Sequence, residues 1–125
     1  MDDYQLAVLE QAPLPLLAML VISFVYYKNN QSPSTLYKHL SYSHCALPIL
    51  GYFYAVIASG STTINNHEPH SIIFIIIMFA SFLLSIVSIF TFKGSKYFHI
   101  LLLATVSITA YLLLAGGMAI THDWL

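Results

Sequence analysis

The sequence predicts an all-α integral membrane protein with four transmembrane helices in an up-down bundle joined by short loops. Residues 71–92 form a run of 22 residues without a charge, a glycine or a proline. As a helix rising about 1.5 Å per residue, this run reaches roughly 33 Å, enough to cross a hydrocarbon core of about 30 Å. The 125-residue chain is 58% hydrophobic and 7% charged, whereas soluble domains carry about 25% charged residues. A lipid bilayer is therefore its expected environment.

Four apolar segments have the length of membrane-spanning helices: about residues 6–27, 40–59, 71–92 and 97–120. The connections 28–39, 60–70 and 93–96 are too short to fold by themselves, so we expect one four-helix transmembrane domain over residues 1–125. Asn, Ser, Gly and Pro residues make the first two connections polar turns. The third has four residues and predicts an antiparallel hairpin of the last two helices.

The first span, about residues 6–27, contains an acid next to two prolines. Prolines donate no backbone hydrogen bond, so Pro13 and Pro15 leave the carbonyls of Leu9 and Gln11 without helical partners. The carboxyl of Glu10 beside such carbonyls could hold a proton or a cation. The alternative is a helix that begins at Pro13, which suits a first turn, with Glu10 as an ordinary acid at the headgroups.

The second span, about residues 40–59, carries three residues that need a structural explanation. Pro48 removes the donor to the carbonyl of His44 and predicts a bend, which serves either as a hinge or as fixed packing. Tyr52 and Tyr54 place hydroxyls in mid-membrane, where each needs a partner helix, a water or a quinone-like ligand.

Small residues recur at helical spacing in the last three spans, and in lipid such faces allow helices to approach closely. The remaining faces are rich in Ile, Leu and Phe, which suits lipid. The small residues either pack this chain alone or leave a face for another subunit. They are Gly51, Ala55 and Ser59 in the second span, Ser81, Ser85 and Ser88 in the third, and Ser107, Ala110 and Gly117 in the fourth.

Charge predicts the orientation in the membrane. Lys28 and Lys38 lie in the first loop, Lys93 and Lys96 lie in the third, and the chain contains no other lysine or arginine. Positively charged loops stay in the cytoplasm, so both termini are expected outside, in a multi-pass protein of the cell's inner (plasma) membrane.

Histidines supply the candidate cofactor ligands. His44 and His99 each lie within about two turns of the start of a helix, and these helices run parallel, the geometry of a bis-histidine haem b. The alternative is a pair of imidazoles tolerated at the interface. On the opposite side His67, His70 and His122 offer donors suited to zinc or copper, or to pH sensing. Their spacing matches no metal motif, and Pro69 interrupts the helical register, so a solvated loop is the simpler explanation.

The sequence contains no GxSxG, HExxH or P-loop motif and no paired intramembrane aspartates, so we expect no enzyme. A net charge of −1 without arginine excludes a nucleic-acid-binding surface. The predicted function is non-catalytic helix–helix association, as a subunit of a larger membrane complex or as a homo-oligomer that could form a pore. The alternatives are an electron-transfer subunit with haem or quinone at His44, His99, Tyr52 and Tyr54, and a small transporter that uses Glu10.

Overall fold

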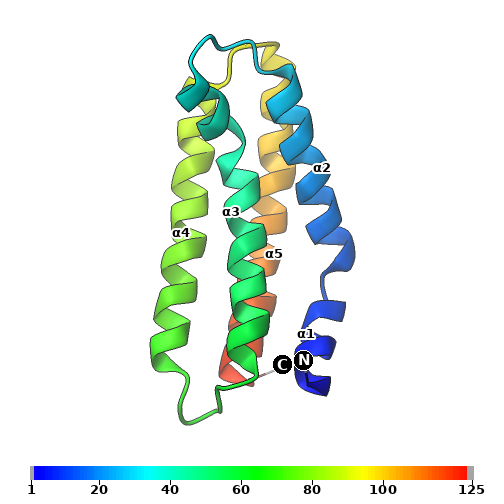
Figure 1. Ribbon diagram of the computed structural model, residues 1–125, viewed down its shortest axis with the longest axis vertical. Coiled ribbons are helices and arrows are strands. Elements are labelled where there is room, and N and C mark those ends of the chain that lie inside the picture. Colours follow the sequence, from blue (N-terminus) through cyan, green and yellow to red (C-terminus); the bar gives the residue numbers. More distant parts are fainter. Residues whose placement is uncertain (1, 124–125) are drawn as a thin grey trace.

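The structure, a computed structural model, describes residues 2–123 and is helical through most of this range (Figure 1). Consecutive long helices run in opposite directions along the molecule (Figure 1). The elements are α1 (Asp3–Glu10), α2 (Pro13–Asn29), α3 (Thr35–Ser59), α4 (Glu68–Thr91), the short 3-10 helix η1 (Lys96–Ile100) and α5 (Leu101–Thr121).

The helices have the dimensions of membrane spans. α3, α4 and the continuous stretch of η1 and α5 are each long and apolar enough to cross a membrane. The bent pair of α1 and α2 adds a fourth candidate when it is counted as one span. Several helices of this length and apolarity in one small chain indicate a membrane protein.

The predicted first span, about residues 6–27, is not one continuous helix. The chain breaks at Gln11 and Ala12, and the axes of α1 and α2 meet at a bend of 56°. Ala12 leaves the helical region, with φ −140° and ψ 34°, because a residue before proline is disfavoured in the α conformation. Pro13 then occupies the first turn of α2, where its missing N–H costs nothing, as in the alternative interpretation.

α3 and α4 begin a few residues earlier than predicted. The Ser34 hydroxyl accepts a hydrogen bond from the Tyr37 N–H and so starts α3 at Thr35 instead of at residue 40. α3 continues through Pro48 as one helix. Ser95 caps η1 in the same way, and η1 leads directly into α5.

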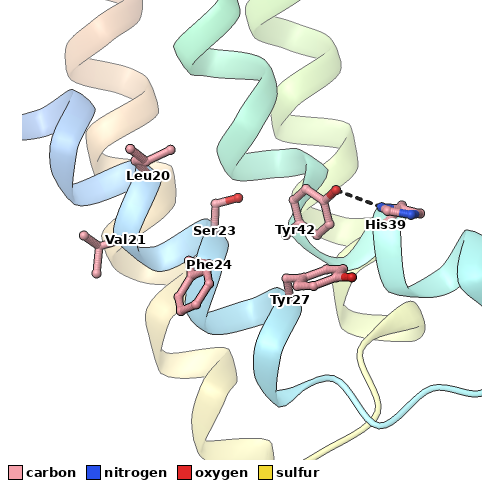
Figure 2. A pocket seen from close by; sticks show the side chains of 7 residues that line it. All are labelled: Leu20, Val21, Ser23, Phe24, Tyr27, His39 and Tyr42. Carbon is pink, nitrogen blue, oxygen red and sulfur yellow. Dashed lines mark hydrogen bonds between the residues drawn. The ribbon is translucent and has the colours of Figure 1, made fainter.

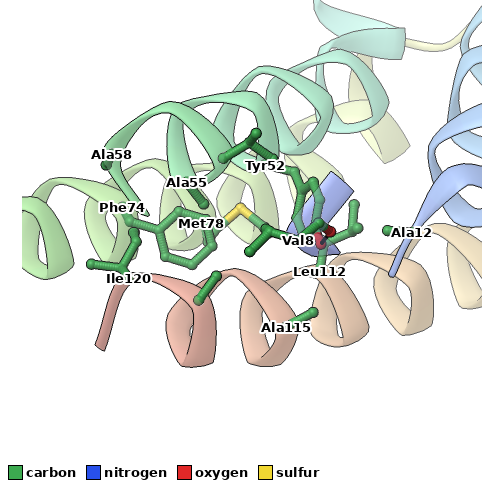
Figure 3. Packing of buried hydrophobic residues seen from close by; sticks show 12 residues of the cluster. Val8, Ala12, Tyr52, Ala55, Ala58, Phe74, Met78, Leu112, Ala115 and Ile120 are labelled. Carbon is green, nitrogen blue, oxygen red and sulfur yellow. Dashed lines mark hydrogen bonds between the residues drawn. The ribbon is translucent and has the colours of Figure 1, made fainter. Parts of the chain in front are cut away.

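α3 is the central helix, since it packs against α1, α2, α4 and α5. Its residues Tyr52, Ala55 and Ala58 belong to a buried cluster at the end of the bundle that holds α1 (Figure 3). A second cluster lies toward the other end and consists of Met19, Tyr26, Cys45 and Phe92.

The distribution of polarity fits a lipid-facing bundle. Large apolar side chains cover the outside, among them Leu14 and Phe90, which are 76% and 73% exposed. Buried hydroxyls instead line the inside of α4 and α5, and several of them donate to a carbonyl of their own helix, as Ser85 does to Ser81 and Thr109 does to Thr105. In a bilayer this arrangement leaves no hydroxyl of these residues unpaired against hydrocarbon.

Candidate functional site

The contact between α3 and α4 is built from small residues. Gly51, Ala55 and Ser59 of α3 are buried, as are Ser81, Ser85 and Ser88 of α4. A Cβ atom on Gly51 would come within 3.0 Å of Met78 Sδ and Ile77 Cγ2. The Ser88 hydroxyl crosses between the helices and donates to the Ser41 carbonyl at 2.8 Å. This face therefore packs within a single chain.

α5 presents its predicted small residues differently. Ser107 is exposed, Ala110 and Gly117 are partly exposed, and a Cβ atom on Gly117 would meet nothing within 4 Å. The neighbouring residue Gly116 instead faces the core, where a Cβ atom would collide with the ring of Phe74. The buried face of α5 consists of Thr105, Thr109, Leu112, Ala115, Gly116, Ala119 and Ile120.

The outward side of α5 borders an open groove against α4, with a volume of about 460 Å³. Its walls are apolar, while Ser71, Thr121 and Asp123 add polar atoms at the end where α4 begins and α5 ends. Gly117 forms part of the wall. The apolar part is lined by Phe74, Ile75, Phe79, Leu113, Leu114 and Met118.

The break between α1 and α2 is closed by tyrosine hydroxyls from other helices. Tyr52 of α3 donates to the Val8 carbonyl at 2.6 Å, and Tyr111 of α5 donates to the Gln11 carbonyl at 2.7 Å. The Leu9 carbonyl accepts from the Ala12 N–H at 3.3 Å. The carbonyls expected to be free beside Glu10 are therefore all paired.

Glu10 itself is exposed at the end of α1, and α1 lies at the same end of the bundle as the end of α5 (Figure 1). The structure thus places Glu10 directly before the break, and α2 begins at Pro13 as in the alternative interpretation. The role of Tyr111 was missed from the sequence. The only indication was a hydroxyl in the middle of an apolar segment, which needs a partner.

His44 and His99 are linked through aromatic rings. His44 is fully buried, with its ring edge-on to Tyr26 at 5.0 Å and its Nε2 atom 3.4 Å from Cys45 Sγ. His99 contacts Phe92 at 6.0 Å, and Phe92 contacts Tyr26 at 5.3 Å. The Nδ1 atoms of both histidines are buried without a hydrogen-bond partner among the described residues. As arranged, the chain's own rings pack against both imidazoles.

The three histidines at the opposite end bind three different hydroxyls. His67 pairs with Ser71 at 2.9 Å, and His70 pairs with Tyr54 at 2.8 Å. His122 pairs with Thr62 at 3.2 Å and stacks on Tyr4. Within residues 2–123 the structure brings together no group of three or more metal-ligating side chains. The Tyr54 hydroxyl thus has its hydrogen-bond partner within the chain, in His70.

Comparison of the chain with protein-family models, curated proteins and solved structures gives no match. The functional assignment therefore depends on the grooves, the helix faces and the hydrogen bonds described above.

Proposed function

We propose that this chain is a non-catalytic multi-pass protein of the cell's inner (plasma) membrane that acts through helix–helix association. Its partners are copies of itself or other subunits of a membrane complex. The proposal depends on one observation above all, the outward position of Gly117 beside the open groove between α4 and α5.

Small residues drive helix association in lipid because they allow two backbones to approach closely. Inside the chain, Gly51 allows α4 to approach closely and Gly116 makes room for the ring of Phe74. Gly117 and Ser107 have no such use within the chain, since both lie on the outward part of α5. A helix from another chain has the shape to fill the groove at Gly117.

The orientation belongs to the same proposal. The end of α2, the start of α3 and the connection from α4 to η1, which carry the lysines, lie at one end of the bundle, and α1 and the end of α5 lie at the other (Figure 1). The positive-inside rule places the lysine end in the cytoplasm and the termini outside. An ion pore, if copies surround one, has to be lined by outward hydroxyls such as that of Ser107, because Ser81 and Thr109 are buried inside the chain.

The adjacent glycines of α5 provide the test. The full chain is purified in mild detergent from the native membrane, and the mass of the assembly and any co-purifying chains are measured. We expect the wild-type protein to exceed the 14.0 kDa of one chain. Gly117→Leu fills the groove and should reduce this mass while the helix content measured by circular dichroism stays unchanged, since leucine also favours the helix.

Gly116→Leu is the matched control. The same side chain one position earlier collides with Phe74 and should lower the unfolding midpoint strongly. A monomeric wild type without co-purifying chains, or an unchanged mass for Gly117→Leu, would contradict the proposed function. The absorption spectrum of the same preparation tests the electron-transfer alternative, because haem b at His44 and His99 gives a Soret band.

A further inference from the structure

A second groove lies between α2 and α3, near the end of the bundle where residues 30–34 connect these helices (Figure 2). Its volume is about 580 Å³. Leu20, Val21 and Phe24 form an apolar wall on α2, and they are 59%, 54% and 61% exposed. Ser23 also lines the groove.

The groove becomes polar toward the connection. Tyr27 of α2 and the pair of His39 and Tyr42 of α3 line this part, and the Tyr42 hydroxyl lies 2.8 Å from His39 Nδ1 (Figure 2). The groove thus offers hydrocarbon contacts at one end and hydrogen-bonding groups at the other, along the direction in which a lipid molecule lies in a bilayer.

Two ammonium groups stand at the polar end. Lys28 Nζ lies 5.6 Å from the centroid of the Phe24 ring, and Lys38 Nζ lies 4.9 Å from that of Tyr27. Both rings line the groove. The chain's five acids, Asp2, Asp3, Glu10, Glu68 and Asp123, belong to α1, the start of α4 and the end of α5, all at the opposite end (Figure 1). Within residues 2–123 no carboxylate forms an ion pair with the two lysines at the groove.

We infer that this groove binds a phospholipid with an anionic headgroup. An acyl chain lies along Leu20, Val21 and Phe24, and the headgroup phosphate lies between the ammonium groups of Lys28 and Lys38. Basic pockets between membrane helices select anionic lipids in this way, because the lysines supply charge and the apolar wall supplies hydrocarbon contact. The inference is independent of the proposed association, since that uses the groove between α4 and α5.

A quinone is the competing occupant. Its carbonyls would accept hydrogen bonds from the His39–Tyr42 pair. A neutral quinone, however, has no net charge to attract the two uncompensated lysines, so their position favours the phosphate. The distinction is therefore a matter of charge, and variants that change charge alone separate the two ligands.

The test uses the purified full chain in mild detergent, titrated with phosphatidylglycerol or with phosphatidylcholine of identical acyl chains. Native mass spectrometry counts the lipids bound per chain. We expect preferential binding of phosphatidylglycerol. The double variant Lys28→Gln, Lys38→Gln should weaken it about 30-fold, at about fivefold per lysine, and leave phosphatidylcholine unchanged.

Lys93→Gln, Lys96→Gln is the matched control, because it removes the same charge at the same end and leaves the two lysines that lie over the groove rings Phe24 and Tyr27. Its affinity for phosphatidylglycerol should stay within about twofold of wild type, less than the loss of one lysine contact. Ser23→Phe keeps every charge and fills the groove, so it should weaken both lipids. Circular dichroism confirms that each variant keeps its helix content.

Three results would overturn the inference. Equal binding of the two lipids by the wild type, or an equal loss in the Lys93 and Lys96 variant, would mean that no selective site exists at Lys28 and Lys38. Displacement of phosphatidylglycerol by millimolar inorganic phosphate would mean that the apolar wall contributes nothing. One-for-one displacement by a quinone, undiminished in the Lys28 and Lys38 variant, would assign the groove to the quinone.

Discussion

Two tyrosine hydroxyls replace backbone hydrogen bonds at the break between α1 and α2. In a continuous helix the Gln11 carbonyl would accept from residue 15, but Pro15 has no N–H. Tyr111 donates to this carbonyl instead, and Tyr52 donates to that of Val8, whose helical donor Ala12 has turned to Leu9. Such replacement matters most in an apolar environment, where water is not available to pair a carbonyl.

Removal of either hydroxyl should therefore destabilise the protein. Tyr111→Phe keeps the ring but leaves the Gln11 carbonyl without its donor, which costs about 1–3 kcal/mol. Tyr52→Phe removes a hydrogen bond of about 1 kcal/mol from the Val8 carbonyl, which still accepts from the Gln11 N–H at 3.1 Å. We expect a lower midpoint of thermal unfolding in detergent for both, with the larger effect for Tyr111.

Tyr97→Phe serves as the control for these variants. Tyr97 is 81% exposed, so removal of its hydroxyl should leave the midpoint of thermal unfolding unchanged. If all three variants unfold at the wild-type temperature, the tyrosine hydroxyls do not hold the break.

The sequence predicts these tyrosine–carbonyl hydrogen bonds only in part. It shows that Pro13 and Pro15 deprive carbonyls of donors, and that a mid-membrane hydroxyl such as that of Tyr52 needs a partner. It does not show which hydroxyl reaches which carbonyl, because Tyr111 and Gln11 are 100 positions apart and only the packing of α5 brings them together.

At the level of the helices, the prolines determine the shape of the first span. Pro13→Ala with Pro15→Ala restores both missing N–H groups, so α1 and α2 should join into one straight helix. α1 would then leave its site on α3 and α5, where Gln5 donates to the Ile57 carbonyl and Tyr4 donates to the Ala119 carbonyl.

A distance between spin labels measures this change. Labels at Ala7 and Ile64, on a Cys45→Ala background, report the separation of α1 from the loop after α3, and both positions are exposed. The distance should lengthen in the double proline variant. It should stay at the wild-type value in Leu14→Ala, which alters an exposed side chain and keeps both prolines. An unchanged distance in the proline variant would show that the bend has another cause.

Helix positions were predictable because long apolar runs between polar turns leave few choices, and the helix ends moved by a few residues where Ser34 and Ser95 act as caps. The inward face of α5 was not predictable in the same way. Gly116 and Gly117 are equally small and point about 100° apart on the helix. Gly116 is the buried one because it faces the ring of Phe74 on α4, and the sequence does not show this contact.

For the whole molecule, the lysines should control the orientation. A reporter fused after residue 125 should be active outside the cytoplasm, and one inserted between Gly94 and Ser95 should be active inside it. Replacement of all four lysines by glutamine removes the bias and should give a mixed orientation. As a control, four exposed Asn and Ser residues are changed to Gln. This variant keeps every lysine and should keep the wild-type orientation. A cytoplasmic reporter after residue 125 in the wild type would reverse the proposed topology.

The hydroxyl that pairs Gln11 has a further consequence for how the protein is made. A ribosome adds about 5–20 residues per second, so Tyr111 is synthesised about 5–20 s after Gln11, given their separation of 100 positions. Until then the Gln11 carbonyl of the nascent chain has to find water or a headgroup as its donor. The N-terminal segment is therefore expected to wait at the bilayer surface and to take its final place only when translation is nearly complete.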